Sequence, residues 1–459
     1  MTAPTITGID LPLGGAQAAA SSMTVSDDET TVTRTILPRG VRIITQHVPA
    51  TRSAAIGLCV PVGSRDESPV HAGATHFLEH LLFKGTPTMT ALDIAVAFDA
   101  VGGETNAETD KEHTQYYARV RDADVDMALS VLTDMVTSSS LVPDAFDVEK
   151  GVILDELAMA KDSPLDAVHE AFAAAVFGDT TLGKPVGGTP EAIRAVSRDD
   201  VWEHYQSHYG PDRLIVSVAG NVEHDHIVDL VAASLDRAGW RGDEGGLGPA
   251  PRRDTTPAQL AQPTVQERHR DVEQAHVIVG CPALQVGDDR IPAMSVLLSI
   301  LGGSMSSRLF QEIREKRGLA YTTYAFNMRY SNAGAFGMYA GTSPAHVEQV
   351  EQLMNEQLQA LASDGPTEEE IVRVRGHVRG AIALGLEDNL SRMGRLSNAE
   401  LTGTYFTVDQ GLARINAVIQ EDVRALAAEL VNAEQGRAVV LPRSQKVGQP
   451  QATAAKEER

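Results

Sequence analysis

The sequence predicts an α+β fold built from two similar α+β domains. Three observations support this prediction. The chain has 459 residues, more than the roughly 100–200 of one ordinary domain. A Gly- and Pro-rich stretch divides it near the middle, and the order of expected strands and helices before that stretch recurs after it. Hydrophobic residues make up 42% of the chain, which is enough for packed cores and excludes global disorder.

The expected domain boundaries follow from composition. Residues 1–31 are rich in small residues without a sustained period and are expected to be a loose leader. A first domain is expected over 32–238, an extended linker over 239–264 and a second domain over 265–443. Residues 444–459 contain few large apolar residues and are expected to be a disordered tail.

The two halves repeat one order of elements. Each opens with strand-like runs and continues with a helix-like stretch, a Gly-Gly turn and another strand-like run. The opening strand-like runs cover 42–49 and 53–62 in the first half and 265–281 in the second. Long amphipathic stretches follow at 124–138 and 345–362, and helix starts are expected after them at Pro143-Asp144 and Pro366-Thr367-Glu368. A duplicated α+β unit is the simplest explanation.

Charge and cysteine content exclude several classes of protein. Lys and Arg number 39 against 62 Asp and Glu, so the net charge is −23, which argues against nucleic-acid binding and favours cationic partners. Two cysteines, Cys59 and Cys281, exclude a disulfide framework and a multi-thiolate zinc site. No apolar stretch approaches the ~20 residues of a membrane span. The first basic residue is Arg34, so no targeting segment is expected and a cytoplasmic location is the default.

The richest chemistry lies in the run His76-Phe77-Leu78-Glu79-His80. Residues four apart share one face of a helix, so His76 and His80 can ligate one metal ion. Glu79 lies near the edge of that face, where its carboxylate can take a proton from a water molecule on the metal. A chance meeting of these residue types is the alternative, because a catalytic zinc also needs a third protein ligand.

Glu149 and Glu156 offer that ligand. They are seven residues apart and therefore lie on the same face of a helix, two turns apart. One can bind the metal while the other orients the surrounding residues. The alternative is a pair of solvated glutamates on a surface helix, although the nearby apolar Val152, Ile153 and Leu157 favour a packed helix.

The run His-X-X-Glu-His is the inverted zinc motif of the inverzincins, and residues 71–86 resemble the pitrilysin or insulinase (M16) type of metallopeptidase. The similarity is greatest to bacterial relatives of the mitochondrial processing peptidase β-subunit. The resemblance implies that His76, His80 and Glu156 bind one Zn²⁺ per chain and that Glu79 is the general base. It also implies that Glu149 is the companion of the ligands.

The resemblance extends over 33–441. The stretch 102–117 looks like the edge strand that lines the family's cleft, where a peptide can add as a further strand. Asn106 is therefore expected to contact substrate; the alternative, a turn asparagine after Gly-Gly, is credible for an isolated asparagine. Glu108 departs from the family pattern, which usually has an aromatic or apolar residue there, and leaves the cleft's side-chain preference open.

The second half has no His-X-X-Glu-His, and its equivalent stretch is 300–321. Gly318 is expected to interrupt any helix between Arg314 and Tyr321, so spacing alone favours a surface arginine and a half-buried strand tyrosine. The resemblance implies instead that both face the zinc across the cleft. There they would bind substrate carbonyls and stabilise the oxyanion.

The expected function is a zinc-dependent endopeptidase that cleaves peptides or unfolded segments inside a closed chamber. The resemblance implies a chamber of four α+β units, and one chain supplies two, so a homodimer is expected. The net charge predicts cationic peptide substrates. Two alternatives remain: a non-catalytic peptide-binding or scaffold subunit of the same fold, and a catalytic subunit that needs a different partner chain.

Overall fold

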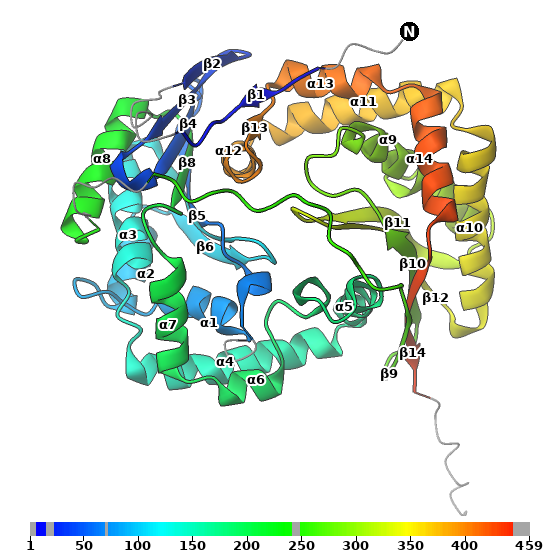
Figure 1. Ribbon diagram of the computed structural model, residues 1–459, viewed down its shortest axis with the longest axis horizontal. Helices are drawn as coiled ribbons and strands as arrows, with labels where there is room; N and C mark the ends of the chain where they lie inside the picture. The colour runs from blue at the N-terminus through cyan, green and yellow to red at the C-terminus, as the bar shows by residue number, and fades with distance from the viewer. Residues whose placement is uncertain (1–5, 15–22, 69–71, 241–247, 444–459) are drawn as a thin grey trace, which may run out of the picture.

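The computed structural model describes residues 6–14, 23–68, 72–240 and 248–443. Figure 1 shows two α+β domains side by side, each with helices packed outside a β-sheet. The first domain contains the strands β2 (Met23–Asp27), β3 (Thr30–Ile36), β4 (Arg42–His47), β5 (Ser53–Val60), β6 (Glu104–Thr109), β7 (Thr114–Arg121) and β8 (Ile215–Gly220). Its helices are α1 (Ala74–Leu82), α2 (Ala91–Asp99), α3 (Val125–Ser138), α4 (Pro143–Asp162), α5 (Pro164–Phe177), α6 (Pro190–Ala195), α7 (Arg198–His208) and α8 (His224–Arg237).

The second domain repeats this content. Its strands are β9 (Val265–Arg270), β10 (Ala275–Pro282), β11 (Ala320–Arg329), β12 (Gly334–Thr342) and β14 (Gly436–Pro442). Its helices are α9 (Ile291–Gly302), a π-helical segment at Phe310–Glu315, α10 (Val347–Asp364), α11 (Glu368–Gly385), α12 (Asn389–Thr402), α13 (Val408–Ala417) and α14 (Gln420–Asn432). The single strand-like run expected over 265–281 is thus two strands, separated by a turn at 271–274.

Five strands of the first sheet have the same topology as the second sheet. The first sheet has the order β2-β3-β4-β8-β5-β7-β6 and the second has the order β11-β12-β10-β14-β9. Strand β4 runs parallel to β8, as β9 does to β14, and the remaining neighbours in both sheets are antiparallel. The series β4-β8-β5-β7-β6 therefore recurs as β9-β14-β10-β12-β11. This repeat confirms the predicted fold of two related α+β domains.

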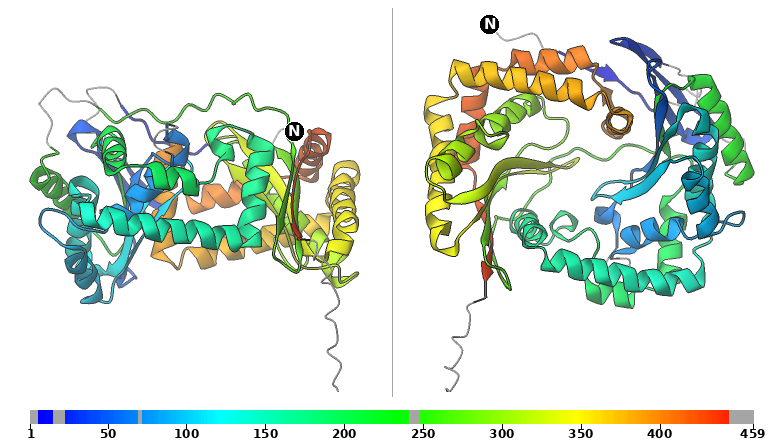
Figure 2. Two further views of the ribbon diagram at one scale, coloured as in Figure 1. Left: turned by 90° about the horizontal axis from the view of Figure 1, so that it is seen from below. Right: turned by 180° about the vertical axis from the view of Figure 1, so that it is seen from behind.

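The domains exchange one helix each. Helix α5 leaves the first domain and packs on the second sheet, where Phe172 is buried against a cluster that includes Ile278 and Ala438. Helix α12 leaves the second domain and packs on the first sheet, where Leu396 is buried near Val32. The right-hand view of Figure 2 shows α5 beside the second sheet and α12 beside the first. Each sheet therefore buries apolar residues against a helix from the other half of the chain, in clusters separate from the main core of each domain.

The expectation of a loose leader over 1–31 is wrong for its described part. β2 pairs antiparallel with β3 at the edge of the first sheet, and β1 (Ile9–Asp10) pairs with β13 (Thr404–Tyr405). Asp27 is buried, accepting hydrogen bonds from the Tyr405 hydroxyl at 2.5 Å and from the N–H of Val408 at 2.7 Å. The partner of β2 is therefore the neighbouring strand β3, whereas β1 and the Asp27 side chain have partners from the second half of the chain.

The segment between the domains has no helix or strand over 248–264. Two arginines attach it to its neighbours. Arg252 donates to the carbonyl oxygens of Glu400 and Leu11, each at 2.7 Å, and Arg253 pairs with Asp66. The tail expected over 444–459 lies outside the described residues. No single described helix is long and apolar enough to cross a membrane; the bent pair Asp122–Ser138 and Pro143–Asp162 passes on length and composition alone.

Candidate metal centre

Helix α1 carries the histidine motif and is fixed at both its apolar face and its N-terminus. Phe77, Leu78 and Leu81 are fully buried, so the opposite face presents His76 and His80 to a polar space. Gly73 precedes the helix in the left-handed region with a φ of +88° and cannot cap it with a side chain. The carboxylate of Glu67 takes that role, accepting from the N–H groups of Gly73 at 2.7 Å and Thr75 at 2.9 Å.

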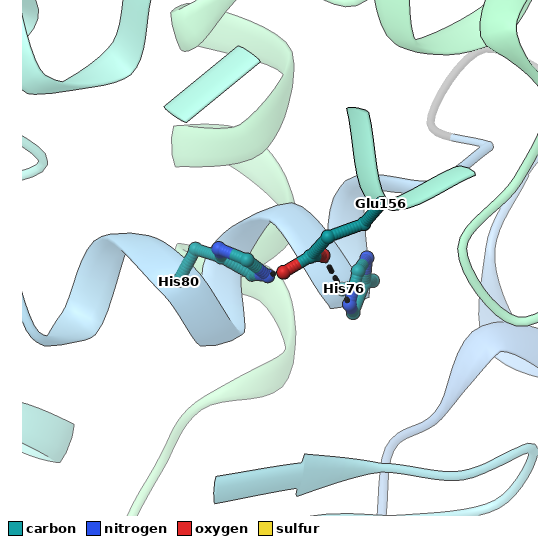
Figure 3. A group of neighbouring side chains, drawn as sticks. All are labelled: His76, His80 and Glu156. Atoms are coloured by element: carbon teal, nitrogen blue, oxygen red, sulfur yellow. Dashed lines mark ion pairs between the residues drawn. The ribbon is translucent and has the colours of Figure 1, made fainter. Parts of the chain in front are cut away.

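Helix α4 brings the carboxylates to the histidines. It begins at Pro143, as the sequence predicts, and Phe146 stacks on Phe77 of α1 with ring centroids 4.4 Å apart. The Oε2 atom of Glu156 lies 3.3 Å from Nε2 of His80 and 3.8 Å from Nε2 of His76. Figure 3 shows the carboxylate between the two imidazole rings.

These three side chains fit a zinc ion. One ligand atom from each lies within 4.8 Å of the others. Zinc takes nitrogen and oxygen ligands at about 2.0–2.2 Å, so two ligands of one ion are separated by little more than 3 Å. Two imidazoles and one carboxylate leave the fourth tetrahedral position open, which is the arrangement of catalytic rather than structural zinc sites. Burial, together with neighbouring His80, lowers the pKa of His76 to about 4, so its ring is neutral and able to ligate at neutral pH.

Glu149 supports the histidine pair from behind. It is buried, and its Oε2 lies 3.0 Å from Nδ1 of His80, while Oε1 accepts from Nζ of Lys84 at 2.7 Å. An acceptor at Nδ1 keeps the proton on that nitrogen and leaves the lone pair of Nε2 for a metal. Of the two glutamates that the sequence offers, Glu156 thus lies next to Nε2 of both histidines, and Glu149 lies next to Nδ1 of His80.

Glu79 is held by the neighbouring strand. The hydroxyl of Thr109 on β6 donates to Oε2 of Glu79 at 2.5 Å. Burial raises the pKa of Glu79, and the Thr109 hydrogen bond and His80 act in the opposite direction. A carboxylate with a raised pKa beside a metal site is suited to accepting a proton from water near neutral pH.

The predicted edge strand is β6, which is only the first part of the stretch 102–117; the remainder is a turn and the start of the inner strand β7. β6 pairs only with β7 among the described strands and forms one edge of the first sheet. Asn106 and Glu108 are exposed on one face of β6, and Thr109 lies on the other face, near α1. The Asn106 side chain accepts a hydrogen bond from the N–H of Ala107 at 2.9 Å. Its contact with substrate stays a prediction.

Arg314 and Tyr321 lie together in the second domain. Nη1 of Arg314 donates to the carbonyl oxygen of Tyr321 at 3.0 Å, and its guanidinium lies 4.4 Å from the centroid of that tyrosine ring. The Tyr321 side chain is 73% exposed. No interaction found among the described residues links this pair to His76, Glu79 or His80. Their role at the zinc therefore stays a prediction.

Three residues at the centre received no role from the sequence. Lys84 lies four residues after His80, and that spacing could have placed it on the same helix face. Thr109 alternates with the exposed residues of β6, but only the tertiary contact of β6 with α1 reveals its partner. Glu67 lies outside α1, so its capping role has no local sequence signal.

Comparison with known families matches both halves of the chain. Residues 42–190 match the family described as insulinase (peptidase family M16). Residues 195–376 match the peptidase M16 inactive domain. The second name agrees with the absence of a His-X-X-Glu-His run from the second half.

Relatives of similar length match most of the chain. An uncharacterized zinc protease of Streptomyces coelicolor is 45% identical over 446 residues, covering 96% of this chain and 97% of that protein. One from Bacillus subtilis is 38% identical, covering 88% and 96%. Among solved structures, a protease from Helicobacter pylori matches with a TM-score of 0.80 at 20% identity, covering 92% of this chain and all of that one. A putative M16-like peptidase from Alicyclobacillus acidocaldarius gives 0.78 at 22%, covering 91% and 100%, and both structures support the fold alone.

Proposed function

Because the chain belongs to the insulinase (M16) peptidase family, we propose that it is a zinc-dependent endopeptidase that cleaves peptides or unfolded polypeptide segments. One observation carries the proposal: one ligand atom each of His76, His80 and Glu156 lie within 4.8 Å of one another, and Glu79 lies on the helix of the two histidines. We assign one Zn²⁺ per chain to these three ligands. The relatives' name, zinc protease, supports the metal.

Three residues of the chain, Glu79, Thr109 and Glu149, have distinct roles in the proposed reaction. When bound, zinc supplies a Lewis acid that polarises the scissile carbonyl and makes a nearby water acidic near neutral pH. Oε1 of Glu79 accepts the proton of that water and returns it to the leaving amine, while Thr109 holds Oε2. Glu149 keeps His80 in the tautomer that presents Nε2.

The substrate is proposed to bind as an added strand. The free edge of β6 offers main-chain hydrogen bonds that depend little on sequence, with Asn106 beside them. Arg314 and Tyr321, which already contact each other, would stabilise the negative charge that develops on the carbonyl oxygen. The net charge of −23 supports a preference for cationic peptides.

The active assembly is proposed to be a cytoplasmic homodimer that encloses a chamber of four α+β units. One chain supplies two such units and carries both the zinc ligands and the Arg314–Tyr321 pair, so no different subunit is required. Light scattering on the active fraction from size-exclusion chromatography tests this assembly. Activity that appears only after a different chain is added would refute it.

A non-catalytic peptide-binding subunit is the alternative function. Chelator treatment of the full chain with a basic unfolded peptide separates the two. The proposal expects cleavage that is lost with chelator, restored by Zn²⁺, and abolished by Glu79→Gln. Glu191→Gln, which changes an exposed glutamate on α6, serves as the matched control and should retain full activity. Cleavage that survives both the chelator and Glu79→Gln, or no cleavage by the parent protein, would refute the proposed zinc-dependent peptidase activity.

A further inference from the structure

A second polar cavity lies apart from the zinc ligands, beneath the linker. Its volume is about 560 Å³. Its walls come from the linker, the turn between β6 and β7, the end of β11 and the end of α12. None of His76, Glu79, His80 and Glu156 lines it. The metal chemistry proposed above therefore gives this cavity no role.

The lining of the cavity is rich in basic residues, whereas the chain as a whole is acidic. Its lining includes the arginines Arg42, Arg213, Arg252, Arg253 and Arg329 against the carboxylates Asp66, Asp110 and Glu112. In a chain with a net charge of −23, this local excess of arginine is contrary to what a random distribution of charge would give. It indicates a ligand that carries negative charge.

Each carboxylate of the lining accepts a hydrogen bond from another residue of the chain. Asp66 accepts from Nη1 of Arg253 at 2.7 Å. Glu112 pairs with Arg65 and accepts from the N–H of Ser331 at 2.9 Å. Asp110 accepts from the N–H of Lys111 at 2.7 Å. Arginines thus balance the charges of Asp66 and Glu112, and Asp110 is the one carboxylate of the lining without an ion pair among the described residues.

Three arginines of the lining lack a carboxylate of their own. Within the described residues, the side chains of Arg213 and Arg329 form no hydrogen bond or ion pair. Arg42 is 2% exposed, and its hydrogen bonds go only to the carbonyl oxygens of Glu400 and Arg213. Its Nε has no partner among the described residues. A buried guanidinium without a full set of acceptors costs stability, and a bound anion would reduce that cost.

We propose that this cavity binds an oxyanion, with Arg213 and Arg329 as the direct ligands and Arg42 as a fixed charge behind them. Guanidinium groups bind carboxylates and phosphates through paired N–H donors, and these contacts are stronger where water is partly excluded. Two sources supply this chemistry: the C-terminal carboxylate of a peptide, or a free oxyanion such as inorganic phosphate.

The position of the cavity favours the peptide source. Thr109, the partner of Glu79, ends β6, and the next residue, Asp110, lines the cavity. At about 3.3 Å per residue, a peptide on β6 needs only a few residues to reach from Glu79 to the cavity. This assignment of source rests on the proposed peptidase function, whereas the oxyanion site itself does not.

Equilibrium binding to the full chain carrying Glu79→Gln tests the site without turnover. Inorganic phosphate is titrated first, followed by two basic peptides that differ only in a C-terminal carboxylate or amide. The double variant Arg213→Gln/Arg329→Gln is compared with Arg379→Gln, an exposed arginine on α11 that does not line the cavity. Matching melting temperatures show that each variant is folded.

We expect the double variant to weaken phosphate binding about tenfold or more, as the loss of two charge-assisted contacts implies, and Arg379→Gln to leave it unchanged. Tighter binding of the acid peptide than of the amide, lost in the double variant, identifies the peptide carboxylate as the ligand. Phosphate binding without that difference identifies a free oxyanion. Phosphate binding that is absent, or equal in parent and double variant, overturns the proposal. A failed cleavage assay would refute the peptidase and leave these binding results intact.

Discussion

Thr109 donates a hydrogen bond to Glu79 across 2.5 Å, which joins the edge strand of the first sheet directly to the metal helix. The strand that is free to pair with a peptide therefore also holds one oxygen of the proposed base. The other oxygen, Oε1, remains available for a water molecule. Substrate position and base position are set by the same element.

Thr109→Val tests this coupling because valine keeps the shape and removes the donor. A hydrogen bond to a charged group contributes about 1.5–3 kcal/mol, so kcat should fall roughly 10- to 100-fold. Zinc content should not change, since Thr109 contacts no proposed ligand. Thr109→Ser restores a hydroxyl and should recover most of kcat. A valine variant with the parent kcat would show that the contact does not position Glu79.

Glu149→Gln should weaken zinc binding without removing a ligand. The change removes the negative charge that faces His80 and Lys84. Loss of such a supporting partner typically lowers metal affinity by about 10- to 100-fold. Competition with a chelator measures the dissociation constant. Glu156→Gln, which alters the proposed ligand itself, should weaken zinc more. Equal zinc affinity in Glu149→Gln and the parent would contradict the assignment.

The helix exchange predicts that a core change in one domain destabilises the other. Phe172 of α5 is buried in the second domain, and Phe172→Ala should lower the free energy of unfolding by about 3–5 kcal/mol. Leu396→Ala on α12 should cost about 2–5 kcal/mol in the first domain. Urea unfolding followed by a probe in each domain measures both effects. If Phe172→Ala destabilised only the second domain, and Leu396→Ala only the first, the two domains would not be coupled.

The sequence was sufficient for elements whose signals are local. Pro143 predicts the start of α4, and the spacing of His76 and His80 predicts one ligating face of α1. The repeated order of elements predicts two related domains, and the matching sheet orders confirm it. These features depend on periodicity and on helix-start residues, which a single sequence displays.

The sequence was not sufficient for partners that are distant in the chain. An amphipathic pattern shows that α5 and α12 bury one face, but it does not say which sheet each covers. The composition of residues 1–31 does not indicate the strand at Met23–Asp27, and the residues that bury the Asp27 side chain, Tyr405 and Val408, lie far away in the sequence. The contact between Thr109 and Glu79 was missed for the same reason.

The interface between α5 and the second sheet should weaken on acidification because of His169. Its Nε2 lies 2.8 Å from the hydroxyl of Tyr324 on β11, and burial lowers the pKa of His169 below its usual value, with Asp166 acting in the opposite direction. The folded protein therefore resists a proton that the unfolded chain accepts near its ordinary pKa of about 6.5. The stabilisation is complete above that value and is lost as pH falls through it toward the lower folded pKa.

Urea unfolding at about pH 7.5, 6.5 and 5.5 measures this loss as a falling free energy of unfolding. His169→Gln can still bond to Tyr324 but does not titrate, so the decline should become shallower. It should not vanish, because burial also lowers the pKa of His224 and His276. A His169→Gln variant whose stability declines as steeply as that of the parent would exclude this histidine as the source, because a group that cannot take up a proton cannot couple folding to pH.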